Sequence, residues 1–205
     1  MFKNKFFLVF TSVILVAIII YSFVDSQEKP ATEALSDNYA KTVLALRQAK
    51  DEALKTEKDS PIEDKKNFKG LHYFAINPVY KVVATLDKLT SGQSIKVAMT
   101  GGETEEYEAF ANLTFEIDGK KCALKVFKTP EGNLFLPFRD LTSNKETYGA
   151  GRYLDLKMED IKDQSIEIDF NLCYQPYCAY NPSFTCPVPP AENFLNVALK
   201  VGEKM

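Results

Sequence analysis

The chain has 205 residues, 45% of them hydrophobic, which is enough to bury one core and too apolar for a disordered protein. Its 25 basic and 28 acidic residues give a net charge of −3, and the two signs are mixed along the chain. Because phosphate binding needs Lys and Arg clustered on one face, this charge pattern argues against a nucleic-acid partner.

An uncharged apolar run near the N-terminus is long enough to cross a membrane. Lys3 and Lys5 precede the run Phe6–Val24, and acidic residues follow it. A helix of about 20 apolar residues spans the roughly 30 Å hydrocarbon core, and positive residues ahead of it favour a cytoplasmic N-terminus. We therefore expect residues 1–26 to be a transmembrane anchor or a signal peptide. The domain would be extracytoplasmic, in the periplasm or at the cell surface, and either membrane-anchored or, after cleavage, secreted.

A tether and an amphipathic helix are predicted next. Residues 27–37 are polar and typical of a tether. Apolar residues then recur at helical spacing from Asn38 to Lys58, with Ser36 or Asp37 in position to cap the helix. Such a stripe usually packs on the protein's own core, although it could also bind a partner or a membrane surface.

A capping box predicts a second, shorter helix. Ser60, Pro61 and Glu63 stand in the order that places proline at the first helical position and the glutamate within reach of the Ser60 N–H. This helix would occupy residues 61–68. Helical structure would thus fill residues 38–69.

From residue 70 the pattern changes from helix to strand. Short runs rich in β-branched and aromatic residues are separated by turn signals, and Asp118-Gly119 is the strongest hairpin signal among them. The pattern predicts a mainly β fold, an antiparallel β-sandwich or barrel-like sheet over residues 70–205, in a single domain of residues 38–205 with a helical lead-in. The runs are 71–76, 80–86, 94–100, 110–117, 121–128, 133–138, 151–157, 165–172 and 196–201.

The most unusual composition lies between residues 147 and 193, where Pro, Cys, Asn and Tyr are too dense for a plain helix or strand. Loops held on a scaffold are common places for function.

In order along the chain come GRYLD, DFN, Pro-x-Cys-Ala-Tyr, Cys-Pro-x-Pro-Pro and a terminal Gly-Glu-Lys. This series resembles the bacterial and archaeal family known as domain of unknown function 1684, from about residue 47 to residue 204. Gln175 and Cys173 depart from the family pattern. The resemblance implies no established activity.

Three of the four cysteines, Cys173, Cys178 and Cys186, fall in this region. Disulfides persist outside the cytoplasm, so a bond between Cys178 and Cys186 is possible. Unpaired buried thiols are the alternative, and Cys122 in a predicted strand is expected to be one. A zinc site that adds Cys122 or His72 is possible by ligand count, but the spacing lacks a C-x2-C pair, and we expect no metal.

Common catalytic signatures are absent from the sequence, which has no G-x-S-x-G elbow, P-loop or H-E-x-x-H. His72 lacks an orienting partner and is interpreted as an exposed or satisfied strand residue. The catalytic candidates are Asp140, Asp155 and Asp169. If two of them met beside Arg152, one could hold a proton as general acid while the other stayed ionised. Alternatively, Arg152 pairs with one or two of these aspartates and fixes the loops.

A ligand site is the other hypothesis for this region. Flat apolar faces with hydroxyls could line a pocket from Tyr148, Tyr153, Tyr174, Tyr177 and Tyr180. Arg152 could anchor a carboxylate or phosphate group. We therefore predict a binding or envelope-associated module for an unknown small ligand or envelope component, without a cofactor. A hydrolase-like enzyme using the aspartates is the alternative. The predicted ligand-binding residues are Arg139, Tyr148, Arg152, Tyr153, Asn171, Tyr174 and Tyr180.

Overall fold

The structure is a computed structural model that describes residues 31–90 and 93–205, with side chains from residue 37 onward. The chain divides into two units, Met1–Tyr39 and Ala40–Met205, and the features described below belong to the second unit except where α2 begins. The predicted membrane segment lies outside the described residues. Among the helices within those residues, none has the length and apolar character needed to span a membrane.

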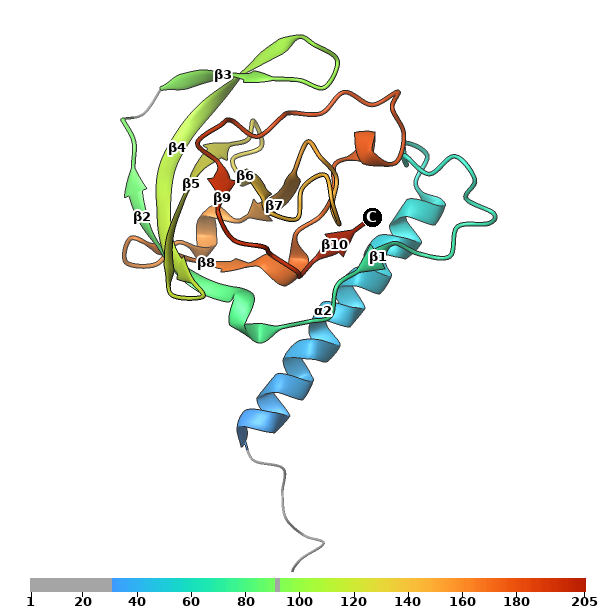
Figure 1. Cartoon of the computed structure of the whole chain (residues 1–205), viewed down its shortest axis with the longest axis horizontal. Coiled ribbons are helices and arrows are strands. Elements are labelled where there is room, and N and C mark those ends of the chain that lie inside the picture. Colours follow the sequence, from blue (N-terminus) through green and yellow to red (C-terminus); the bar gives the residue numbers. More distant parts are fainter. Residues whose placement is uncertain (1–30, 91–92) are drawn as a thin grey trace, which may run out of the picture. The chain divides into compact units, whose positions relative to one another are not determined.

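Helix α2, Ala31–Thr56, begins earlier than predicted and takes up most of the predicted tether. Ser36 and Asp37 therefore lie inside the helix and are not its cap. Three side chains attach the helix to its own domain: Arg47 donates to the Phe74 carbonyl at 3.1 Å, Lys50 pairs with Glu203 at 2.5 Å, and Asp51 accepts the Leu71 N–H at 3.0 Å. From Ala40 onward, the helix lies along strands β1, His72–Tyr73, and β10, Glu203–Lys204, as Figure 1 shows. The predicted docking of this helix on its own domain is confirmed.

The predicted second helix is wrong, because residues 61–68 form only turns. The Ser60 hydroxyl accepts the Ile62 N–H at 3.2 Å, and the Asp64 carboxylate accepts the Asn67 N–H at 3.2 Å. These local bonds satisfy the backbone without a helical turn. Pro61 is the only buried residue of the segment, so a helix here would have no apolar face to stabilise it.

The β part is one curled antiparallel sheet, a half-barrel, so the barrel-like form of the prediction is correct and the sandwich form is not. Its central path runs in the order β7-β6-β5-β4-β2-β8, with β3 beside β4 and β9 parallel to β6. β3 and β2 lie one after the other along the long strand β4 (Figure 1). A separate small sheet joins β1 to β10. The strands are β1 His72–Tyr73, β2 Lys81–Lys88, β3 Ser94–Ala98, β4 Thr104–Ile117, β5 Lys120–Lys128, β6 Leu134–Asp140, β7 Arg152–Leu156, β8 Ser165–Asp169, β9 Phe194–Leu195 and β10 Glu203–Lys204.

The hairpin predicted at Asp118-Gly119 is confirmed. Ile117 pairs with Lys120, which leaves a two-residue loop between β4 and β5. Both loop residues have positive φ, 51° for Asp118 and 71° for Gly119, as a type I′ turn requires. The local twist of this turn matches that of the strands, so the sequence signal and the structure agree.

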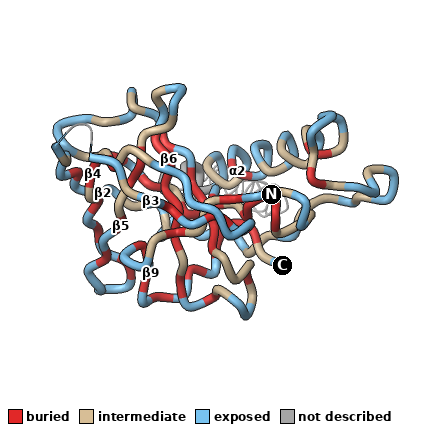
Figure 2. Tube along the Cα trace, turned by 90° about the horizontal axis from the view of Figure 1, so that it is seen from above, coloured by how far each residue is buried: buried red, intermediate tan, exposed pale blue. Residues whose placement is uncertain are grey.

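The sheet buries two separate clusters on its two faces. The larger cluster fills the inside of the curled sheet and includes Leu113, Leu136, Phe138 and Leu154. The smaller cluster consists of Ala109, Phe127, Phe135 and Tyr153, with Tyr107 and Tyr174 packed against it. Figure 2 shows the buried residues concentrated among the strands, while α2 is mostly exposed or intermediate.

A β-bulge in β4 decides which face receives its N-terminal half. The register shifts between Ala109, opposite Phe127, and Ala111, opposite Val126. Because side chains alternate along a strand, residues 109 and 111 would otherwise share one face. The extra residue sends Ala109 to the smaller cluster and Ala111 to the larger one. It therefore brings Tyr107 to the face that carries the pocket described below.

The last predicted run, residues 196–201, does not form a strand. Its side chains alternate as predicted, with Val197, Leu199 and Val201 buried in the core. The carbonyls of Leu199 and Val201 accept hydrogen bonds from the Arg152 guanidinium instead of from a neighbouring strand. A side chain thus replaces the sheet partner that the sequence pattern implied.

Candidate functional site

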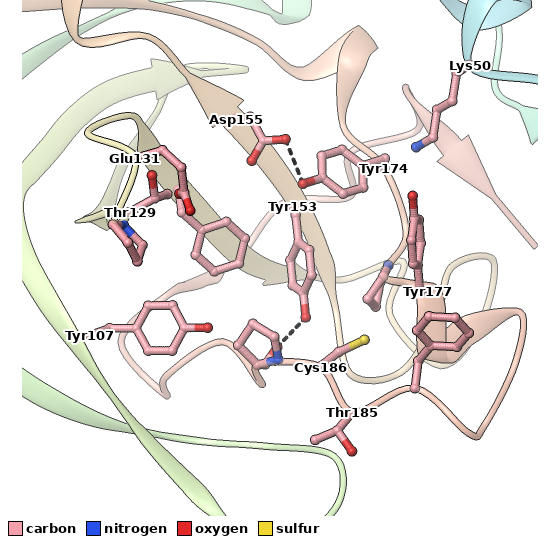
Figure 3. A pocket seen from close by; sticks show the side chains of 15 residues that line it. Lys50, Tyr107, Thr129, Glu131, Tyr153, Asp155, Tyr174, Tyr177, Thr185 and Cys186 are labelled. Carbon is pink, nitrogen blue, oxygen red and sulfur yellow. Dashed lines mark hydrogen bonds between the residues drawn. The ribbon is translucent and has the colours of Figure 1, made fainter. Parts of the chain in front are cut away.

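One pocket of about 680 Å³ opens on the face of the sheet that carries the smaller cluster. We call it the aromatic pocket, because four tyrosines and two phenylalanines line it (Figure 3). Its walls come from α2, β4, β6, β7, the β5–β6 turn and the loop around residues 176–187. The lining residues are Lys50, Tyr107, Thr129, Pro130, Glu131, Phe135, Tyr153, Asp155, Tyr174, Pro176, Tyr177, Phe184, Thr185, Cys186 and Pro187.

Strand residues form the inner wall of the aromatic pocket. The rings of Tyr107 and Phe135 lie with centroids 6.0 Å apart, and Phe135 meets Tyr153 edge to face at 4.8 Å. Asp155 points to the same side as Tyr153, two residues along β7, and its backbone lies opposite Phe135 on β6. The backbone pairing of the strands therefore holds this wall in place, and it fixes the positions of the rings more firmly than a loop would.

Tyr174 extends this wall through backbone pairing with β7. The N–H of Tyr153 donates to the Tyr174 carbonyl at 2.8 Å, and the N–H of Tyr174 donates back at 3.0 Å. The Tyr174 hydroxyl donates to Asp155 Oδ2 at 2.8 Å, while the Tyr153 hydroxyl donates to the Pro187 carbonyl. Burial is the main cause that raises the pKa of both tyrosines, so both remain neutral phenols near neutral pH.

The opposite wall is the loop that carries Tyr177 and Phe184, whose rings meet edge to face at 5.5 Å. Backbone bonds fasten this loop near the end of β3: Thr100 N–H donates to the Cys186 carbonyl at 2.9 Å, and Val188 N–H donates to the Ala98 carbonyl at 2.7 Å. The Tyr153 hydroxyl provides a third attachment. The aromatic pocket is thus built between a rigid sheet wall and a fastened loop.

Lys50 stands at the rim of the aromatic pocket and is already paired. Its ammonium lies 2.5 Å from Glu203 Oε1 and 4.2 Å from the centre of the Tyr174 ring. Glu203 is fully buried and also accepts the Gln175 N–H at 2.8 Å and the Tyr180 hydroxyl at 2.7 Å. The predicted ligand residue Tyr180 therefore belongs to the network that holds this carboxylate, and it does not line the pocket.

Arg152 lies on the other face of the sheet, away from the aromatic pocket, so it is not placed to anchor a ligand there. Its guanidinium donates to Asp140 at 2.6 Å and to the carbonyls of Leu199, Val201 and Glu203. The side chains of Arg152 and Asp140 are each only 1% exposed. Neighbouring residues of a strand point to opposite faces, which separates Arg152 from Tyr153. The alternative interpretation, a structural ion pair, describes this site.

The three aspartates do not form the predicted catalytic pair beside Arg152. Asp140 is buried with that arginine and also accepts the Thr142 N–H at 2.6 Å. Asp155 is exposed in the aromatic pocket. Asp169 accepts the Asn171 N–H at 3.0 Å and so begins a short 3₁₀ helix, Phe170–Leu172. Each carboxylate thus has a different local role, and only Asp155 reaches the pocket.

The remaining predicted ligand residues are placed in supporting positions. Asn171 is fully buried and bonds both the N–H and the carbonyl of Asn77. Tyr148 is half-buried beside Cys178, and burial raises its pKa to about 12. Arg139 lies on β6, and its Nε is buried without a hydrogen-bond partner. None of these three residues lines the aromatic pocket. Of the predicted ligand-binding residues, Tyr153 and Tyr174 line it.

The four cysteines are buried free thiols. Cys122 lies in the larger cluster, as predicted. Cys178 and Cys186 are neighbours, since the Cys178 N–H donates to the Cys186 sulfur at 3.3 Å, but both are free thiols in the structure, so the unpaired alternative describes them and not the disulfide. Burial raises the pKa of Cys186 to about 12, so its thiol is neutral. Within the residues that the structure describes, no three His, Cys, Asp or Glu side chains gather in a way that could hold a metal ion.

Several pocket residues had not been singled out from the sequence: Lys50, Tyr107, Glu131, Phe135 and Phe184. Alternation along β7 could have separated Tyr153 and Asp155 from Arg152. Tyr107 could not have been found in this way, because the bulge that turns it toward the pocket leaves no clear sequence signal. Lys50 and Glu131 come from parts of the chain far from residues 147–193.

Comparison with known proteins identifies a family without an activity. A family model described as a protein of unknown function (DUF1684) matches residues 66–204. The chain is also similar to the solution NMR structure of an uncharacterised protein from Haloarcula marismortui, with 35% sequence identity and a TM-score of 0.66. That similarity covers 84% of this chain and 97% of the other. No curated protein matches the chain.

Proposed function

The chain belongs to the family of proteins of unknown function DUF1684, as its motifs predicted, and we propose that it binds a small organic molecule in the aromatic pocket. The family name states no activity, and the similar solved structure is itself uncharacterised. The proposal therefore depends on the pocket itself.

The observation that carries the proposal is the number of aromatic rings facing one open space of about 680 Å³. Ligand pockets have volumes of roughly 300–1,000 Å³ and combine apolar walls with a few polar groups that orient the ligand. Phe135 and Tyr153 are buried, but the other four aromatic side chains around this space are only partly buried, which forgoes burial that a closed core would gain. A ligand with a flat or apolar body would recover that burial. The carboxylates and hydroxyls would fix its orientation.

Ligand-observed NMR with the full chain and a library of small aromatic and aliphatic compounds tests the proposal. Phe184→Ala, which removes a ring from the loop wall, should abolish or weaken binding by at least tenfold. Phe194→Ala is the matched control, because Phe194 is exposed and lies outside the aromatic pocket. Equal affinity in both variants, or no binding by any compound at millimolar concentration, would contradict the proposal.

We further propose that residues 1–26 place this binding domain outside the cytoplasm, where it would meet a ligand or component of the cell envelope. The support is the apolar run Phe6–Val24 with Lys3 and Lys5 before it. Protease added to spheroplasts, whose cytoplasmic membrane is intact, should then degrade the domain. Protection that lasts until detergent dissolves the membrane would place the domain inside and reject this part of the proposal.

A further inference from the structure

We infer that the ligand of the aromatic pocket is an organic cation, an amine or quaternary ammonium compound with an apolar or aromatic body. This inference rests on the proposed binding function and names the chemical class of the ligand. Three features of the pocket point to it: its electron-rich rings, its unneutralised carboxylates and the way its hydroxyl groups are used.

The first feature is the set of ring faces and edges around the space. Tyr107, Tyr153 and Tyr174 line one wall, and Tyr177 stands on the other (Figure 3). The face of an aromatic ring carries partial negative charge and attracts a cation within about 6 Å of its centre. Lys50 shows that this wall accepts an ammonium, because its Nζ already lies 4.2 Å from the centre of the Tyr174 ring.

The second feature is the charge of the lining. Asp155 and Glu131 are exposed carboxylates that border the pocket from β7 and from the β5–β6 turn. Among the described lining residues, Lys50 is the one cation, and Glu203 holds it at 2.5 Å from outside the pocket wall. The positive charge of Lys50 is thus balanced by the buried Glu203. The charges of Asp155 and Glu131 remain to attract a cation.

The third feature is the direction of the tyrosine hydroxyls on the sheet wall. Tyr174 donates its proton to Asp155, and Tyr153 donates its proton to the Pro187 carbonyl. Both hydroxyls therefore offer a ligand only acceptor lone pairs, since each has a single proton. An anionic ligand would need donors, whereas an ammonium group supplies N–H or polarised C–H donors to such oxygens. The hydrogen bonding of the wall favours a cation.

The experiment compares three probes that share one ring and differ in charge: benzyltrimethylammonium, benzyl alcohol and benzoate. Affinities for the full chain are measured by calorimetry or NMR titration at low and high salt. We expect the cation to bind at least tenfold more tightly than benzyl alcohol and benzoate to bind most weakly. The preference for the cation should shrink at high salt, because exposed carboxylates are screened.

Charge-neutralising variants connect the preference to the named residues. Asp155→Asn and Glu131→Gln should each lower the affinity for benzyltrimethylammonium three- to tenfold and that for benzyl alcohol by a smaller factor, so that the ratio of the two affinities falls. The asparagine oxygen can still accept from Tyr174, so the wall should keep its geometry. Glu192→Gln is the control, since Glu192 is an exposed carboxylate outside the pocket. Thermal melting confirms that each variant is folded.

The outcomes separate this inference from the function on which it rests. Similar affinity for all three probes, or tightest binding of benzoate, would overturn the cation inference and leave the binding function standing. Failure of all three probes and of the compound library at millimolar concentration would overturn both. A cation preference that survives both neutralising substitutions would support a cationic ligand, but it would assign the preference to the aromatic rings instead of to the carboxylates.

Discussion

The five residues of strand β7 are divided between its two faces, and the two faces have different roles. Arg152, Leu154 and Leu156 point into the filled core, where the arginine is sealed with Asp140. Tyr153 and Asp155 point into the aromatic pocket. The core face is closed and has its buried charges paired, whereas the pocket face combines packed rings with an exposed carboxylate. Substitutions one residue apart should therefore affect different properties: stability on the core face and binding on the pocket face.

This contrast also explains why a charged residue in a conspicuous motif is not a site. Arg152 makes four hydrogen bonds, three of them to the carbonyls of Leu199, Val201 and Glu203. Leu199 and Val201 belong to no strand, and buried carbonyls need a donor. The guanidinium thus supplies hydrogen-bond donors that a neighbouring strand would otherwise supply. Arg152 therefore stabilises the fold, whereas the adjacent Tyr153 lines the pocket.

The largest effect should come from Arg152→Met. It leaves Asp140 and three carbonyls unpaired in the core, and removing one partner of a buried ion pair costs about 3–5 kcal/mol. Urea denaturation followed by circular dichroism measures the free energy of unfolding. Adding Asp140→Leu should recover part of the loss, because no lone charge then remains buried. A loss under about 1 kcal/mol for Arg152→Met would contradict the structural role.

A matched pair of substitutions on β6 compares the two faces directly. Phe138 is fully buried in the larger cluster, so Phe138→Ala should lower the free energy of unfolding by about 3–5 kcal/mol. Phe135→Ala should cost roughly 1–2 kcal/mol less, because Phe135 borders the aromatic pocket and water can enter the space it leaves. Only Phe135→Ala should also weaken ligand binding. Equal losses of stability, measured by urea denaturation, would mean that the pocket face is packed as a core.

High pH should destabilise the protein through its buried tyrosines. Burial raises the pKa of Tyr153, Tyr174 and Tyr180 in the folded state above the unfolded value of about 10. Their contribution is therefore fully present below about pH 10 and falls by about 1.4 kcal/mol per pH unit for each group above it. Urea titrations between about pH 8 and 11 measure the loss.

Tyrosinate absorbance gives an independent check on this pH effect. It should appear together with loss of the far-ultraviolet dichroism, because the buried phenols ionise only when the chain unfolds. Tyr80 and the other more exposed tyrosines should titrate before that transition. Ionisation of all ten tyrosines near their ordinary pKa in a folded protein would show that the pocket wall is open to solvent.

Local signals predicted the sheet well. Eight of the predicted runs contain an observed strand or most of one, and the Asp118-Gly119 turn is correct to the residue because its geometry depends on two adjacent residues with positive φ. The run at 196–201 has the correct alternation but no strand partner, since pairing depends on the rest of the fold. The helix at 61–68 failed because a capping box cannot compensate for the lack of an apolar face.

The site was predicted only in part, for reasons of geometry. The sequence singled out a region that contributes to the aromatic pocket and named Tyr153, Tyr174, Tyr177 and Asp155 in it, but it combined them with Arg152 from the opposite face. Residues brought in by tertiary contacts, such as Tyr107 through the β4 bulge, carry no signal in their own neighbourhood. Composition can locate a functional region, whereas the face of each strand decides which residues share a site.

The smallest effect should come from an exposed ion pair, Lys125 with Glu192, which contrasts with the buried pair of Arg152 and Asp140. Lys125 Nζ and Glu192 Oε1 are 2.9 Å apart, but the side chain of Lys125 is 22% exposed and that of Glu192 is 50% exposed. The hydrogen bond from Lys125 lowers the pKa of Glu192. The pair therefore stabilises the fold at pH values above the ordinary glutamate pKa. This stabilisation is lost as the pH falls through the lowered pKa of Glu192. Since exposed pairs contribute about 0–1 kcal/mol, Glu192→Gln should change the free energy of unfolding by less than about 0.5 kcal/mol at neutral pH. A loss as large as that of Arg152→Met would mean that burial does not distinguish the two pairs.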